Sequence, residues 1–231
     1  MAKRIKALFR IFKNEHYRDD FKAGHLYFNT LEYFKNIEDT QEFCIADKCE
    51  GAIGFFQPDK IKMRLAGIDI IDLAGPVIIS EADLNYCNVL CMTSINDGLL
   101  DINKKYTLEE IRTKSFFSDK TVSMGDFAIC IINTSEFIQR IETVAKKCRY
   151  KLIQGLVEYY DSQSFSGNFE YPNNLFYKRN EFSYQREYRI VLEKIASEKN
   201  PIILDVGDIS SICMDVHTQE INNLIQFEAK V

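Results

Sequence analysis

The sequence predicts an α+β fold in which mixed or antiparallel sheets pack against a few helices. Short strand-like runs recur along most of the 231 residues. One long stretch, residues 133–148, places Phe137, Ile138, Ile141 and Val144 on a single helical face. Strands and helices do not alternate strictly, as they would in a doubly wound parallel sheet. With four prolines and no Pro/Gly-rich linker, residues 1–231 are expected to form a single domain.

The expected strands are short apolar runs bounded by turn-forming or charged residues. Residues 126–132 form a largely apolar run typical of a buried strand, and residues 86–95 alternate so that Cys87, Val89 and Cys91 share one face. The other expected strands are residues 5–12, 25–28, 52–56, 61–73, 76–80, 150–161, 186–192, 201–206 and 209–214.

The expected helices are amphipathic stretches with recognisable ends. Asn14 is expected to cap the first helix and Gly24 to end it. A second helical turn is expected to be capped by Asn29, with Glu32 placed three residues later. The expected helices are residues 14–24, 29–36, 107–114, 133–148 and 217–230.

The composition bounds the function. A hydrophobic content of 46% suffices for a sizeable core, and a net charge of −5 argues against a general nucleic-acid-binding surface. The N-terminus has no signal-peptide core, and no window approaches the length of a transmembrane helix. The seven cysteines are therefore expected to be reduced thiols in a cytoplasmic protein.

Nothing in the spacing of the histidines or cysteines predicts a metal site. The three histidines lie far apart, and the nearest cysteine pairs, Cys44/Cys49 and Cys87/Cys91, have unmatched spacings. Residues 37–51 gather five acidic side chains, and such clusters can bind a divalent cation. The interpretation we favour is a solvated loop, so no metal is expected. The acidic side chains are Glu38, Asp39, Glu42, Asp47 and Glu50.

The stretch FSYQREYRIVL, residues 182–192, begins polar and becomes a strand. If the strand starts near Arg186, then Gln185, Glu187 and Arg189 project to one face. The opposite face carries the apolar side chains. One edge of the sheet is therefore expected to present an amide, a carboxylate and a guanidinium together.

Two further features could join this polar edge. Arg10 interrupts the apolar strand ALFRIF, where buried arginine requires an acid or a bound anion. Thr93 and Ser94 place hydroxyl groups at the end of the strand NVLCMTSI. The chain thus supplies an arginine, then hydroxyls, then Gln-x-Glu, each in or at the end of an expected strand.

Five motifs follow one another along the chain: GHLYFNTLEYF, DKCEG, NVLCMTSI, GDFAICI and LFYKRNEFSYQREYRIVL. Their order resembles that of a widespread bacterial family of domains of unknown function, which closes with F-x-[YH]-E-x-E-[YW]-R. The chain departs from this family in having Gln185 where glutamate is common. It also lacks the Trp/His-rich segment that often follows the middle strand. The resemblance suggests a bacterial or phage conflict setting, as a toxin, defence effector or counter-defence protein.

The order Arg, Ser/Thr, [Glu/Gln]-x-Glu is similar to that of the ADP-ribosyltransferase superfamily. That resemblance implies two packed, split sheets that cleave NAD, as substrate, in a cleft lined by strands. It implies that Arg10 holds the NAD phosphates or ribose, and that Thr93 and Ser94 belong to the same binding cleft. It further implies that Glu187 binds the ribose hydroxyl and stabilises the oxocarbenium-like transition state, with Gln185 positioning the acceptor, which is a protein, a nucleic acid or water.

Three alternatives remain open from the residues alone. Arg10 and Glu187 could form a buried ion pair that only joins two strands. The protein could instead capture a nucleotide-like ligand or a partner protein without turnover. A nuclease would need metal carboxylates in residues 37–51, where no nuclease spacing is present.

The aromatic segment 165–182 could stack on a base or on nicotinamide, or form a lid packed on the core.

Overall fold

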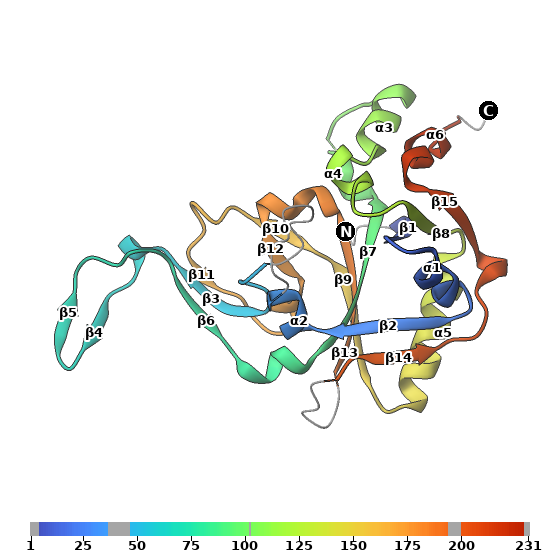
Figure 1. The fold of residues 1–231 in the computed structure, drawn as a ribbon. Coiled ribbons are helices and arrows are strands. Elements are labelled where there is room, and N and C mark those ends of the chain that lie inside the picture. The colour runs from blue at the N-terminus through green and yellow to red at the C-terminus, as the bar shows by residue number, and fades with distance from the viewer. Residues whose placement is uncertain (1–4, 37–46, 102, 194–199, 229–231) are drawn as a thin grey trace.

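The computed structural model describes residues 5–36, 47–101, 103–193 and 200–228 (Figure 1). They form an α+β fold in which nearly all strand pairs are antiparallel, as the sequence predicted. The largest sheet has the order β14-β2-β7-β1-β8-β15, in which β2 and β1 pair with the same edge of β7. Strand β13 pairs with the opposite edge of β7, and β9 pairs with β13. The strands of this sheet are β1 (Ile5–Phe12), β2 (His25–Thr30), β7 (Asn88–Asn96), β8 (Phe127–Ile131), β9 (Lys151–Leu156), β13 (Glu187–Glu193), β14 (Ile202–Asp205) and β15 (Cys213–His217).

Three smaller sheets extend the molecule to one side of the large sheet (Figure 1). One of them contains the parallel pair β10 and β12. The expected strand at residues 61–73 is instead a hairpin, because Ala66 and Gly67 adopt positive φ and turn the chain back. The strands are β3 (Ala52–Phe56), β4 (Met63–Leu65), β5 (Ile68–Ile70), β6 (Val77–Ser80), β10 (Glu158–Tyr160), β11 (Gly167–Asn168) and β12 (Tyr177–Arg179).

The main core lies between the large sheet and two helices, α1 (Glu15–Lys22) and α5 (Thr134–Lys147). Asn133 caps α5 by accepting a hydrogen bond from the backbone N–H of Glu136 at 3.1 Å. The helix then buries Phe137, Ile141 and Ala145 against the sheet. Asn14 caps α1 as predicted, accepting from the N–H of His16 at 2.9 Å.

The other face of the large sheet is covered by short helices, and two predictions there were wrong. Helix α2 (Leu31–Asn36) is capped by Thr30, the last residue of β2, and not by Asn29. The Thr30 hydroxyl accepts from the N–H of Tyr33 at 3.2 Å. The last expected helix is a single turn, α6 (Ile221–Leu224), because Ile225 leaves the helical conformation and is buried in the core beside α3 and α4. Those helices are α3 (Leu108–Ser115) and α4 (Asp119–Val122).

A split in the large sheet creates the space for a site. Strands β1 and β2 both pair with the same edge of β7, β1 along Thr93 to Asn96 and β2 at Asn88 and Val89. Between these registers, residues 90–92 of β7 pair with neither strand on that edge. The opposite edge of β7 pairs with β13 over this length. The sheet therefore opens on one side of β7 while β13 holds the other side in place.

Candidate functional site

A cavity of about 230 Å³ lies at this split, between β1, β7, the start of β13 and helix α2. Its wall is part apolar and part charged, a mixture typical of sites that bind small molecules with oriented polar groups. The lining residues are Phe9, Arg10, Ile11, Lys13, Tyr33, Phe34, Cys91, Met92, Thr93, Met124, Lys178, Gln185 and Glu187.

The structure brings four of the five predicted site residues together in this wall: Arg10, Thr93, Gln185 and Glu187. Ser94 is not among the lining residues. Its hydroxyl is buried and donates to the carbonyl oxygen of Arg186 at 2.9 Å. Ser94 therefore packs against the turn that precedes β13 and does not contribute to the cavity wall.

The geometry at the start of β13 explains why Gln185 and Glu187 face the same space. Arg186 adopts a left-handed conformation, with φ of 44°, at the end of the turn Asn180–Gln185. The N–H of Glu187 then donates to the Tyr159 hydroxyl at 2.9 Å. Beyond this point the predicted alternation is confirmed, since Tyr188, Ile190 and Leu192 lie in the main core beside α5.

Glu187 is held by two cations. Its Oε1 accepts from Nε of Arg189 at 2.5 Å, and its Oε2 lies 3.3 Å from Nζ of Lys178. Burial alone would raise the pKa of Glu187, but Arg189 and Lys178 hold it well below its ordinary value. The carboxylate is therefore ionised at neutral pH although it is 4% exposed.

The Arg10–Glu187 ion pair, one of the alternatives left open by the sequence, is not formed. The Arg10 guanidinium instead donates to the carbonyl oxygen of Cys91, in the stretch of β7 that lacks a strand partner on this edge. Burial lowers the pKa of Arg10, and the nearby charge of Glu187 partly offsets that effect. Burial also raises the pKa of the Cys91 thiol well above its ordinary value, with a further contribution from Glu187.

The acidic segment contributes to this site from inside the protein, contrary to the interpretation as a solvated loop. Glu50 is 1% exposed and pairs with Lys178 at 3.0 Å and with Arg189 at 2.9 Å. Asp47 is also buried and pairs with Arg179 at 2.8 Å. The other three acidic residues of the segment, Glu38, Asp39 and Glu42, lie outside the described residues.

Lys178, Glu50, Glu187 and Arg189 thus form one cluster of buried charges, which we call the charge cluster. Burial alone would lower the pKa of Lys178, but the two carboxylates raise it above its ordinary value. Sequence reasoning missed Lys178 and the role of Glu50, because nothing near either residue marks it as buried. The cluster fixes the position of Glu187 without closing it off from the cavity.

The aromatic segment 165–182 packs on the protein. The rings of Phe165 and Phe169 stack with centroids 4.7 Å apart, and Tyr177 lies 4.8 Å from Phe169. They form a core with Phe55 and Tyr160 under the small sheets. These rings therefore support the region that carries Lys178 and do not line the cavity.

In the parts of the chain that the structure describes, no group of three or more His, Cys, Asp or Glu side chains is placed to hold a metal ion. The six cysteines in those parts are free thiols. No helix of the described chain is long and apolar enough to cross a membrane.

Comparison with known proteins returned no matching family model, no matching curated protein and no matching solved structure. The arrangement itself places the ionised carboxylate of Glu187 in one wall with an arginine, a threonine and a glutamine, around a cavity of about 230 Å³. Such a set can bind an anionic group and stabilise positive charge that develops on a bound sugar.

Proposed function

We propose that this cavity binds NAD and that the protein cleaves the bond between its ribose and nicotinamide, as an ADP-ribosyltransferase or an NAD glycohydrolase. The observation that carries the proposal is the convergence of Arg10, Thr93 and Glu187 from three strands, and of Gln185 from the turn before β13, at the split of the sheet. Their types and chain order are those that the resemblance to the ADP-ribosyltransferase superfamily singled out.

The chemistry follows from the charges. As the bond between the ribose carbon and the nicotinamide nitrogen breaks, nicotinamide leaves with the electron pair and becomes neutral, so it needs no general acid. Positive charge develops on the ribose, and the ionised carboxylate of Glu187 stabilises it. An acceptor nucleophile then bonds to the same carbon and loses its proton to solvent.

The dimensions fit part of the dinucleotide. The cavity, at about 230 Å³, is smaller than the roughly 300–1,000 Å³ of sites that enclose drug-sized ligands. It accommodates a ring and its sugar, with the rest of NAD extending outward. Arg10 and Lys13 in the wall supply positive charge for the diphosphate.

The decisive experiment compares nicotinamide release from NAD by the wild type, Glu187→Gln and Glu50→Gln, at a temperature where circular dichroism shows all three folded. Both variants remove a carboxylate from the charge cluster, but of the two carboxylates Glu187 lines the cavity and Glu50 does not. We expect Glu187→Gln to lower the rate by about 100-fold or more, and Glu50→Gln to retain it within about tenfold. Equal losses would assign Glu187 a structural role.

Capture of an anionic nucleotide-like ligand without turnover is the second candidate. It is favoured by the wall itself, where Arg10 and Lys13 supply positive charge in addition to the paired charges of Lys178 and Glu187. Titration calorimetry with NAD distinguishes the two candidates. Tight binding without nicotinamide release supports capture, and absence of both binding and release rejects NAD.

A further inference from the structure

Lys178 contacts both predicted catalytic side chains, Gln185 and Glu187. Its Nζ donates to Oε1 of Gln185 at 2.9 Å and lies 3.3 Å from Oε2 of Glu187. The same nitrogen pairs with Oε1 of Glu50 at 3.0 Å. The Lys178 side chain is 3% exposed, yet it lines the cavity together with the two residues that it holds.

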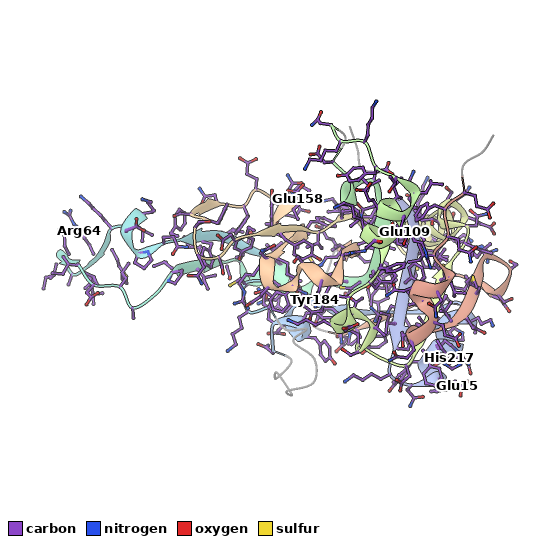
Figure 2. All side chains as sticks on the ribbon, turned by 90° about the horizontal axis from the view of Figure 1, so that it is seen from above. Glu15, Arg64, Glu109, Glu158, Tyr184 and His217 are labelled. Atoms are coloured by element: carbon purple, nitrogen blue, oxygen red, sulfur yellow. The ribbon has the colours of Figure 1, made fainter. Side chains whose placement is uncertain are left out.

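The fold brings Lys178 to this position from a separate strand. Strand β12, which carries Lys178, pairs in parallel with β10, where Tyr159 lies opposite Lys178. Figure 2 labels Glu158 in β10 and Tyr184 in the turn before β13, and the two lie in the same part of the molecule. Because the Tyr159 hydroxyl accepts from the N–H of Glu187, β10 holds the backbone of Glu187 while β12 holds its carboxylate.

The contact with Lys178 also fixes which way the amide of Gln185 points. An ammonium group donates hydrogen bonds and accepts none, so the atom of Gln185 that faces Lys178 is the amide oxygen. Gln185 is 5% exposed, so little solvent competes for that oxygen. Lys178 thus fixes the amide of Gln185 and the carboxylate of Glu187 relative to each other.

We propose that Lys178 is a positioning residue for the cleavage of NAD and that it acts through Gln185 and Glu187. This inference rests on the proposed function and adds to it a residue that sequence reasoning did not single out. A carboxylate stabilises developing charge only if it is already in place, and a displacement of about 1 Å can cost about 100-fold in rate. A lysine that is buried and joined to three side chains provides that fixed position.

A lysine that merely neutralised buried carboxylates would act through its charge and not through its contacts. The charge cluster holds two cations and two carboxylates, so a balanced variant can separate these roles. Lys178→Met/Glu50→Gln removes one of each and leaves Arg189 paired with Glu187. Glu50→Gln alone is the matched control, because it keeps the contacts of Lys178 with Gln185 and Glu187.

Steady-state kinetics of nicotinamide release from NAD test the proposal, at a temperature where circular dichroism shows the proteins folded. We expect the double variant to have a kcat about 10–100-fold below that of Glu50→Gln, with KM within about threefold. Lys178→Met/Glu50→Leu should give the same result. It replaces the pair with apolar groups, an exchange that is often neutral or stabilising for buried ion pairs, and so serves as a second folded variant.

Three outcomes would overturn the proposal. A kcat equal to that of Glu50→Gln would give Lys178 a purely structural role, and a raised KM at unchanged kcat would make it a ligand-binding residue. In both cases the wild type still releases nicotinamide, so the proposed function would stand. No release by the wild type would reject the proposed function, and this inference with it.

Discussion

The charge cluster and the arm, residues 57–76 with the hairpin β4–β5, distribute their side chains in opposite ways. The cluster places four charged groups inside the protein, while the arm exposes four aliphatic groups to solvent. Both regions contain an arginine–carboxylate pair. Arg189 and Glu187 have side chains that are 0% and 5% exposed, and Arg64 and Asp69 have side chains that are 70% and 55% exposed.

The comparison shows that the surroundings of an ion pair decide what it contributes. A pair in water gains little, because solvent screens the charges and would solvate each partner equally well. A buried pair is different: removing one partner leaves the other charge without solvent, so the loss is large even where the pair itself adds little net stability. Such a cluster holds its members in one geometry, which a binding site requires.

The largest expected effect is that of Arg189→Met. This change leaves the carboxylates of Glu187 and Glu50 with Lys178 as the remaining cation of the charge cluster, and it removes a hydrogen bond to the carbonyl oxygen of Leu175. We expect the free energy of unfolding to fall by about 3–5 kcal/mol, measured by urea denaturation. A loss below about 1 kcal/mol would show that water reaches the cluster and that the contrast with the arm is wrong.

Acid should weaken the charge cluster. The folded-state pKa of Glu187 lies well below its value in the unfolded chain, so the unfolded chain takes up the proton first. The stability from this group is present above about pH 4.3 and is lost as the pH falls further. Denaturation of the wild type and of Glu187→Gln between about pH 5 and pH 3 checks this. Over this pH range the free energy of unfolding should fall less for Glu187→Gln than for the wild type. An equal fall would contradict a lowered pKa of Glu187 in the folded protein.

A feature of the site could be predicted from the sequence where it depends on residues that are neighbours in the chain. The faces of β13 follow from the period of a strand, so the shared side of Gln185, Glu187 and Arg189 was predictable. The pairing of Glu50 with Arg189 joins residues 139 positions apart, and no local pattern contains it. An Arg10–Glu187 pair was one alternative from the sequence, but the structure pairs that carboxylate with Lys178 and Arg189.

The fold shows the same division. The large α5 helix and most strands follow from apolar periodicity and capping residues. The last helix stops early because tertiary contacts compete with its local preference. Asn222 exchanges hydrogen bonds with the backbone of Phe117, and Ile225 packs into the core beside it. The split of the sheet depends on two separate registers along β7, which the sequence of that strand does not reveal.

A smaller effect separates the cavity wall from the packing behind it. Ser94→Ala removes a buried hydroxyl that donates to the carbonyl oxygen of Arg186 and accepts from the side-chain amide of Asn96 at 3.0 Å. The carbonyl keeps the hydrogen bond from the backbone N–H of Ser94, whereas the Asn96 amide loses its acceptor. We expect a loss of about 1 kcal/mol in stability and unchanged ligand binding. Thr93→Val should leave the stability nearly unchanged and weaken ligand binding, because Thr93 lines the cavity. Urea denaturation and calorimetry with NAD measure both quantities, and equal behaviour of the two variants would place both residues in the packing.

The smallest expected effect is that of Arg64→Ala. This change removes an ion pair that water already screens, and the free energy of unfolding should change by less than about 1 kcal/mol. Salt sharpens the test, since the Debye length falls from about 10 Å at 0.1 M to about 3 Å at 1 M. Raising the salt should erase what remains of the Arg64 effect while leaving most of the Arg189→Met loss, because ions do not reach a fully buried guanidinium. If both losses shrank equally, the two pairs would share one solvent environment, and the distinction between cluster and arm would fail.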